Sequence, residues 1–390
     1  MRYVPRTLEG RIQHDLDRNR SVLLLGARQT GKTTLVNRLK ADLMISFVQP
    51  DVRQRYEKSP HQLRGEVEAL QTSGKKRPLV ILDEVQKVPA ILDMVQDLID
   101  RKKANFVLTG SSARKLRRST HVNLLPGRVS VFKLDPFSLR ELPARDLEER
   151  LVYGSLPGSL AVENKDDREN DLRSYVTTYL EEEVRAEAVV RRLGDFARFL
   201  ELAASESGGI VNLRKLSQEI GVSHTTIGSY YQILEDCLIA ERIEPLIQSK
   251  TRKKLTKSDR YLFFDLGVRR LAAREGTQLS RDTLGRLFEQ FVGLELLRNA
   301  HAAKHPARIR FWRDPDGPEV DWVIDQENTL IPIEVKWTDK PHVNDIRHIG
   351  IFMSEYSEAK AGYLVCQVPR KLQLNNHIFA LPWQMIGEIL

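Results

Sequence analysis

The sequence of 390 residues has little cysteine and no long apolar run. Its two cysteines, Cys237 and Cys366, lie among apolar residues without metal-ligand spacing, which predicts reduced core thiols and excludes a disulfide-rich scaffold. No stretch approaches the roughly 20 consecutive apolar residues of a membrane span. Residues 1–10 carry charges and a proline where a signal peptide has its apolar segment. We therefore expect a cytoplasmic protein without a membrane partner.

Internal repeats and low-complexity tracts are also missing, and the composition is that of a globular protein. The chain is too long for one ordinary domain, so two or three domains are expected. Its net charge is +8. This excess favours acidic partners without identifying one, because attraction to a phosphate backbone needs positive charge gathered on one face.

A complete G-x-x-x-x-G-K-T segment follows an apolar run. It consists of Gly26, Ala27, Arg28, Gln29, Thr30, Gly31, Lys32 and Thr33, with Thr34 next in the chain. Its two glycines let the loop turn its backbone N–H groups toward a β-phosphate, and a helix expected over residues 32–39 presents its positive end to the same anion. We expect Lys32 to reach the β- and γ-phosphates and Thr33 to bind Mg²⁺. The spacing, with a strand before and a helix after, makes a chance glycine-rich turn a poor alternative.

Two carboxylates, Asp83 and Glu84, end another apolar run, as in a buried parallel strand that delivers acids to its C-terminal edge. Alone they would suggest a solvated strand end. Beside a phosphate loop, Asp83 is expected to hold Mg²⁺ through water and Glu84 to align the water that attacks the γ-phosphate. A further apolar strand, residues 105–108, leads into Thr109 and Ser111, so either hydroxyl could sense that phosphate.

The order of these motifs resembles that of AAA-type ATPases, and most of all their archaeal-type branch. The resemblance includes Gly127-Arg128 before the last expected core strand and the stretch Leu134-Asp135-Pro136-Phe137-Ser138. It implies an α/β P-loop fold with a parallel sheet, ATP and Mg²⁺ as cofactors, and a homo-oligomer, by family habit a hexamer. It also implies that Arg128 compensates charge at the γ-phosphate, within a subunit or across an interface. A surface arginine at a strand start is an equally good explanation of Arg128.

The middle of the chain combines a charged helical stretch with a helix-turn-helix pattern. The resemblance places Gly154-Ser155-Leu156-Pro157-Gly158 in a small helical lid over the nucleotide. In the helix-turn-helix, Gly221 supplies the turn and Ser223 caps the second helix. That helix would expose a set of small polar side chains, and residues 241–246 would form a wing strand. The exposed set is His224, Thr225, Thr226 and Ser229.

Residues 250–260 contain six basic residues and one acid. Beside a winged helix such a run suits contact with DNA phosphates, but many winged helices bind protein and many basic runs are solvated loops. DNA is therefore the expected partner, and whether it is branched, duplex or single-stranded stays open.

The last 110 or so residues predict an α/β domain in the order αβββαβ. Asp321 and Glu334 are expected on adjacent strands and Lys336 on the same face as Glu334, while Glu289 lies on the first helix. Two carboxylates, Asp321 and Glu334, would hold Mg²⁺ at a scissile phosphate, and Lys336 would orient or deprotonate water.

These four residues resemble the PD-(D/E)xK nuclease superfamily, in particular its resolvase-like members with a helix glutamate. The alternatives are a fold retained for binding, with cleavage lost, and carboxylates paired to the nearby Arg310 and Arg313.

We thus expect four parts: an AAA-type core (residues 1–140), a helical lid (141–192), a winged helix with a basic segment (193–260) and a nuclease-like domain (261–390). The preferred function is an ATP-hydrolysing, DNA-binding ATPase that translocates on or remodels DNA. One alternative is a nucleotide-gated regulatory or antitoxin-like switch that binds a protein, and another is an ATP-dependent, Mg²⁺-dependent DNA nuclease.

Overall fold

The computed structural model describes residues 3–112, 127–144, 146–180, 193–249 and 255–389. It divides into two compact units. Unit 1 is Met1–Pro136 with Asp236–Leu238, and unit 2 is Phe137–Glu235 with Ile239–Leu390. The three parts that the sequence predicts after the ATPase core therefore pack together as a single unit.

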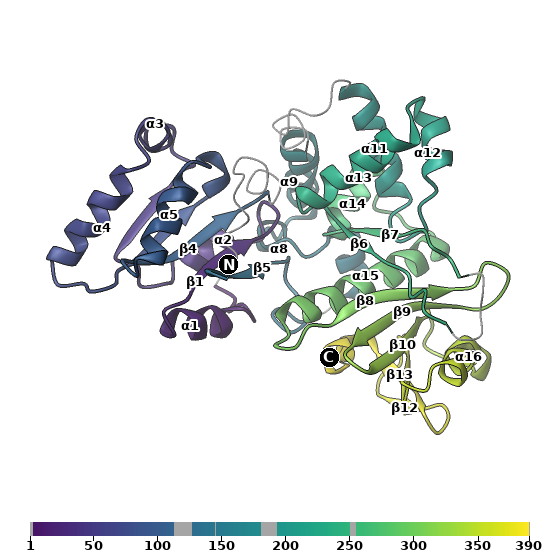
Figure 1. The fold of residues 1–390 in the computed structure, drawn as a ribbon. Helices are drawn as coiled ribbons and strands as arrows, with labels where there is room; N and C mark the ends of the chain where they lie inside the picture. Colours follow the sequence, from purple (N-terminus) through teal and green to yellow (C-terminus); the bar gives the residue numbers. More distant parts are fainter. Residues whose placement is uncertain (1–2, 113–126, 145, 181–192, 250–254, 390) are drawn as a thin grey trace. The chain divides into compact units, whose positions relative to one another are not determined.

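Unit 1 is built on a five-stranded sheet in the order β2-β3-β4-β1-β5, with every pairing parallel (Figure 1). The strands are β1 (Ser21–Leu25), β2 (Leu43–Ser46), β3 (Leu79–Asp83), β4 (Asn105–Gly110) and β5 (Val129–Lys133). All five residues of β1 are buried, as expected of a central strand covered on both faces. Because the strands are parallel, the C-terminal ends of β1, β3 and β4 lie at one edge of the sheet.

The helices of unit 1 pack on this sheet through apolar faces. They are α1 (Glu9–Asp17), α2 (Lys32–Val36), α3 (Pro50–Lys58), α4 (Gln62–Thr72) and α5 (Ile91–Asp100), with a 3-10 turn at Val85–Lys87. In α5, Ile91, Val95 and Leu98 recur at helical spacing and are buried in the same cluster as Phe106 of β4. Helix α2 is shorter than expected, because regular helix ends at Val36.

The first half of unit 2 is helical. Its elements are α7 (Leu147–Tyr153), α8 (Pro157–Ala161), α9 (Lys165–Ser174), a π-helical turn (Tyr175–Leu180), α11 (Leu193–Ser205), α12 (Leu213–Ile220), α13 (His224–Asp236), the hairpin β6 (Ala240–Ile243) and β7 (Arg260–Phe263), and α14 (Leu266–Ala272). The α12–α13 turn has Gly221 in the left-handed region at φ 82°, as the helix-turn-helix pattern predicts.

The Gly-Ser-Leu-Pro stretch lies in a buried polar junction of unit 2. The Ser155 N–H donates to Asp265 Oδ2 at 2.6 Å, and Arg298 Nη1 donates to the Ser155 hydroxyl at 3.4 Å and to Glu295 Oε1 at 2.7 Å. A Cβ at Gly154 would overlap the Asp265 carboxylate. These contacts give the stretch a structural role within unit 2.

The second half of unit 2 is a long helix against a six-stranded mixed sheet. Its elements are α15 (Arg281–Ala302), β8 (Arg308–Arg313), β9 (Glu319–Gln326), β10 (Thr329–Val335), a 3-10 turn (Val343–Ile346), α16 (Arg347–Glu355), β11 (Gly362–Cys366), β12 (Leu372–Gln373), β13 (Ile378–Pro382) and a final 3-10 helix (Trp383–Glu388). The order is β12-β13-β11-β10-β9-β8. Strands β12 and β13, which extend the sheet beyond β11, were not expected from the sequence.

Within the described ranges, no helix combines the length and the apolar character needed to cross a membrane.

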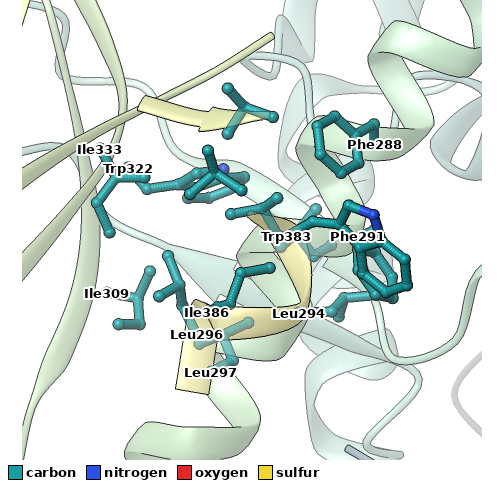
Figure 2. Close-up of a cluster of buried hydrophobic side chains, with 14 of the residues drawn as sticks. Phe288, Phe291, Leu294, Leu296, Leu297, Ile309, Trp322, Ile333, Trp383 and Ile386 are labelled. Atoms are coloured by element: carbon teal, nitrogen blue, oxygen red, sulfur yellow. The ribbon is translucent and has the colours of Figure 1, made fainter. Parts of the chain in front are cut away.

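A shared apolar core joins the two halves of unit 2. Figure 2 shows side chains of α15, the sheet and the last 3-10 helix meeting in one cluster, with Trp322 and Trp383 among them. Leu151 of α7, Leu262 of β7 and Leu266 of α14 belong to the same cluster. Helices α7 and α14 and the hairpin thus share the core of the C-terminal sheet.

Close packing of α15 on this sheet gives a test of unit 2. A Cβ on Gly293 would lie 2.5 Å from the buried Trp322 ring, so Gly293→Ala should lower the free energy of unfolding by about 1–3 kcal/mol through overpacking. The control is Gly285→Ala on the same helix, where the new Cβ meets only Trp337 Cβ at 3.9 Å. It should be neutral or stabilise by up to about 1 kcal/mol. Urea denaturation measures both, and equal effects would contradict this packing.

Candidate functional site

The phosphate loop leaves β1 at the edge where β3 and β4 also end. Gly26 is held close to the end of the sheet, because a Cβ there would lie 2.5 Å from the carbonyl oxygen of Leu134. Gly31 has φ 95°, in the left-handed region that glycine adopts without strain, and it precedes α2 directly. The Thr30 hydroxyl donates to the Ala27 carbonyl at 2.9 Å and braces the loop internally. The two glycines and this hydrogen bond therefore define the conformation of the loop.

Lys32 is the charged group of this loop. Its side chain is buried, and Nζ donates to the carbonyls of Gly26 at 2.9 Å and Ala27 at 3.1 Å. Nζ also lies 3.7 Å from Glu84 Oε1. A buried ammonium at the mouth of a phosphate loop is well suited to an anionic ligand, such as the β- and γ-phosphates.

Asp83, at the end of β3, lies beside the first turn of α2. Both of its carboxylate oxygens are 3.3 Å from Thr33 Oγ1, and Oδ2 accepts from the Ser46 hydroxyl at 3.2 Å. The Thr109 hydroxyl donates a hydrogen bond to Asp83 Oδ1 at 2.6 Å and accepts one from the Glu84 N–H at 3.0 Å. The oxygens of Thr33 and Asp83 fit the hard-oxygen preference of Mg²⁺. Thr109 is fully buried, and its hydroxyl hydrogen is already used in the bond to Asp83. It therefore fixes the two acids and does not contact phosphate directly.

Glu84 is held by residues that lie outside the phosphate-loop and Asp-Glu motifs. Its backbone is left-handed, at φ 60° and ψ 50°, a conformation that costs a non-glycine residue energy and concentrates at functional sites. Oε2 accepts from the Ser111 hydroxyl at 3.0 Å and from the Gln86 side-chain amide. Ser111 thus contacts the catalytic candidate, and its expected role in sensing the phosphate stays a prediction. Only the proximity of Gln86 to the Asp-Glu pair could have indicated its role.

Arg128 lies away from this edge. It directly precedes β5, whose first residue pairs with Ser21 at the start of β1, so Arg128 is at the opposite end of the sheet from the phosphate loop. Its guanidinium donates to both oxygens of Asp100, at 2.6 and 3.0 Å. The expectation that Arg128 compensates γ-phosphate charge within its own subunit is therefore wrong. A role across an interface stays a prediction.

Arg6 is a further contact of the loop that the sequence did not reveal. It is buried, and it donates to the carbonyls of Thr30 at 2.7 Å and Asp135 at 2.6 Å. The segment before α1 thus braces the phosphate loop and the chain after β5. No motif surrounds Arg6, so the sequence carried no signal for it.

The helix-turn-helix region presents little positive charge on its second helix. His224, Thr225 and Ser229 of α13 are exposed as expected, while Thr226 is half-buried and bonds to the cap residue Ser223. Much of the basic run, residues 250–254, lies outside the described residues.

Arg260, the last basic residue of that run, is 4% exposed. Its Nη1 donates to Glu289 Oε1 at 3.0 Å and to the Asp321 carbonyl at 3.2 Å, with the guanidinium over the Phe311 ring. The expectation that Arg260 contributes to phosphate contact is wrong, because the side chain is enclosed by the C-terminal sheet.

The predicted nuclease-like residues come together on β9 and β10. Asp321 Oδ2 accepts from the Val335 N–H at 2.8 Å, which places this carboxylate against the neighbouring strand. Lys336 Nζ donates to Glu334 Oε1 at 2.9 Å, and Lys336 is partly exposed while Glu334 is buried. Glu289 stands beside them on α15 and is bound to Arg260.

The electrostatics of this cluster suit a cation. Burial, with the Asp321 charge adding to it, raises the pKa of Glu334 to about 9 and that of Glu289 to about 8. Burial likewise raises the pKa of Asp321. Glu334 Oε2 is buried without a hydrogen-bond partner among the described residues. Within those same residues no three His, Cys, Asp or Glu side chains form a metal-ligand group, so an ion would be held by Asp321 and Glu334 and completed by water or phosphate.

Comparisons with protein families divide the chain into three consecutive matches. Residues 18–143 match the AAA domain, residues 144–283 match a domain of unknown function (DUF8612), and residues 284–386 match another (DUF4143). The first match, with the parallel five-stranded sheet and the phosphate loop, establishes an AAA-type P-loop domain with an α/β fold.

Two relatives are mycobacterial. The chain is 25% identical over 344 residues to the uncharacterized proteins Mb2031c of Mycobacterium bovis and Rv2008c of Mycobacterium tuberculosis, covering 87% of this chain and 75% of each relative. The similarity extends over both units.

Solved structures align weakly. Drosophila ORC, in a complex with AT-rich DNA and Cdc6, is 11% identical over 67% of this chain and 88% of its own, with a TM-score of 0.26. C. elegans PCH-2 is 15% identical over 60% of this chain and 66% of its own, with a TM-score of 0.27. TM-scores of this size do not establish a common fold.

The loop geometry predicts separable defects in binding and hydrolysis. Lys32→Ala should abolish nucleotide binding, because it removes the buried ammonium that would contact the phosphates. Glu84→Gln should bind ATP and fail to hydrolyse it, because the amide cannot polarise water as a carboxylate does. Equilibrium binding of a fluorescent ATP analogue and phosphate release measure the two steps. Normal turnover by Glu84→Gln would show that another residue positions the water.

The raised pKa values of Asp321, Glu289 and Glu334 predict a pH-dependent response to metal. Above about pH 4–5 the carboxyl groups of the unfolded chain lose their protons, while those of the folded cluster keep them. The contribution of the cluster to the stability of the fold is therefore full below this range and falls as the pH rises toward about 9. A divalent ion offsets the repulsion that then develops. Mn²⁺ should therefore raise the melting temperature of unit 2 more at about pH 8 than at about pH 6.

Scanning calorimetry of the wild type and of Asp321→Asn measures this effect. The variant should lose the Mn²⁺-induced shift. An equal shift in both proteins would place the ion elsewhere.

Proposed function

We propose that this chain, whose residues 18–143 form an AAA-type P-loop domain, hydrolyses ATP with Mg²⁺ and uses the hydrolysis to translocate on or remodel DNA. The observation that supports hydrolysis most strongly is the convergence of Lys32, Asp83 and Glu84 at one sheet edge, since phosphoryl transfer depends on positioning and charge stabilisation. AAA-type domains bind nucleotide, so the comparison with known families supports the same conclusion.

Each residue of the site has a separate task. Backbone N–H groups of the loop and Lys32 bind the phosphates, and Thr33, backed by Asp83, holds Mg²⁺. When bound, Mg²⁺ neutralises charge on the β- and γ-phosphates. Glu84 accepts a hydrogen bond from the attacking water and aligns it with the γ-phosphorus, while Thr109 keeps both acids in place.

DNA is the proposed partner because of the net charge of +8 and the helix-turn-helix with its hairpin and basic run. Lys257 of this run is exposed and suits phosphate contact. Backbone contacts of this kind are independent of sequence and sensitive to salt.

The regulatory switch is the second candidate, and the surface of α13 favours it. This helix carries no lysine or arginine, and it ends in the acids Glu235 and Asp236. Inserted into a major groove it would offer no cation to the flanking phosphates. A protein partner is consistent with such a neutral surface.

Nuclease activity is the third candidate, favoured by the contacts within the carboxylate cluster. Lys336 lies 2.9 Å from Glu334, and an ion on Asp321 and Glu334 would place a phosphate next to this ammonium. In this candidate Lys336 orients or deprotonates the attacking water.

We also propose self-association, which the position of Arg128 supports. An arginine at the far edge of the sheet reaches a nucleotide only in a neighbouring subunit, so the proposed homo-oligomer, a hexamer by resemblance, would complete each site in trans. We place the protein in the cytoplasm.

ATP hydrolysis with different DNA molecules tests the proposal. The purified chain should show a low basal rate and severalfold stimulation by single-stranded, duplex or four-way-junction DNA at moderate salt. An unchanged rate with no DNA retained would favour the protein-gated switch. Gel analysis of the same reactions reports cleavage, which should be lost in Asp321→Ala and Lys336→Ala if the nuclease candidate is right.

A further inference from the structure

Gln86 occupies a buried position beside the water-aligning candidate. It lies in the 3-10 turn after β3 and is 6% exposed. Its side-chain Nε2 donates to Glu84 Oε2 and to the Ser111 hydroxyl, the latter at 2.9 Å. Ser111 in turn donates to the same Glu84 oxygen at 3.0 Å. One carboxylate oxygen of Glu84 is thus held from two sides.

The second oxygen of Glu84 is directed to the phosphate loop. Oε1 lies 3.7 Å from Lys32 Nζ, and Lys32 is the group expected to contact the γ-phosphate. A carboxylate fixed through Oε2 has little freedom to rotate, so Oε1 keeps its direction toward the loop. Oε1 therefore faces the position at which it would hold an attacking water.

The side-chain amide of Gln86 contains a polar atom that destabilises the fold. Its oxygen, Oε1, is buried and accepts no hydrogen bond from the described part of the chain. An unsatisfied buried acceptor destabilises a fold, and an apolar side chain of similar size would avoid this. Such a group in a native site calls for a functional explanation, and the two N–H donors supply one.

We propose that Gln86 is a positioning residue for ATP hydrolysis: with Ser111 it fixes Glu84 Oε2 so that Oε1 is presented to the water at the γ-phosphate. This inference rests on the proposed ATPase function. It assigns Gln86 no direct contact with nucleotide, so ATP affinity should not depend on it.

Steady-state kinetics of Gln86→Leu test the inference. Loss of both donors should lower kcat by about 10- to 100-fold, the penalty for a displaced catalytic group, with the Kd for ATP unchanged. The melting temperature should stay the same or rise, because the unsatisfied oxygen is removed. A residue kept only for structure would show the opposite pattern, with lower stability and normal turnover per folded molecule.

Two further variants separate the possible outcomes. Gln71→Leu removes a glutamine of α4 that donates to the carbonyls of Lys76 and Lys103, and it should leave kcat unchanged. Adding Gln86→Leu to Glu84→Gln should leave the Kd for ATP of Glu84→Gln unchanged, because Gln86 acts through Glu84 and does not contact the nucleotide.

The results distinguish this inference from the function on which it rests. A wild type without turnover would refute the ATPase proposal itself. If the wild type turns over and Glu84→Gln does not, normal kcat in Gln86→Leu would overturn the role of Gln86 alone. A weakened ATP affinity in Gln86→Leu, or in the double variant compared with Glu84→Gln, would overturn it equally.

Discussion

Parallel pairing of β1 with β4, and of β4 with β3, is the constraint on which the nucleotide site depends. It brings the ends of three strands to one edge, so that Thr33, Asp83 and Thr109, far apart in the sequence, lie within hydrogen-bonding distance. The parallel pairing of β5 with β1 places the start of β5, with Arg128, at the opposite end of the strands. Parallel pairing thus brings the candidate catalytic groups together and separates Arg128, the candidate for γ-phosphate charge compensation, from them.

The second unit is organised by a shared core instead of separate domains. Leu151, Leu262 and Leu266 pack into the cluster formed by α15 and the C-terminal sheet. Arg260 adds a polar link, since it starts the hairpin strand β7 and binds Glu289 beside the carboxylate cluster. The hairpin and the cluster are therefore linked by an ion pair.

Motifs with a fixed spacing were predictable from the sequence, and residues that contribute through tertiary contacts were not. Residues 26–33 and Asp83-Glu84 carry their chemistry in local order, and the sequence also predicted three consecutive strands after the first helix of the C-terminal part, where β8 to β10 lie. Gln86 and Arg6 have no such signature, because their roles arise from neighbours brought in by the fold. Arg260 was misassigned for the same reason: a basic run does not show which member turns inward.

The most direct test of the nucleotide site is a crystal structure of Glu84→Gln grown with ATP and Mg²⁺. The account predicts a triphosphate along the backbone of residues 26–33. Lys32 Nζ should then have moved from the carbonyls of Gly26 and Ala27 to phosphate oxygens, with the ion next to Thr33. Lys32 still bound to those carbonyls, with ATP elsewhere on the protein, would contradict it.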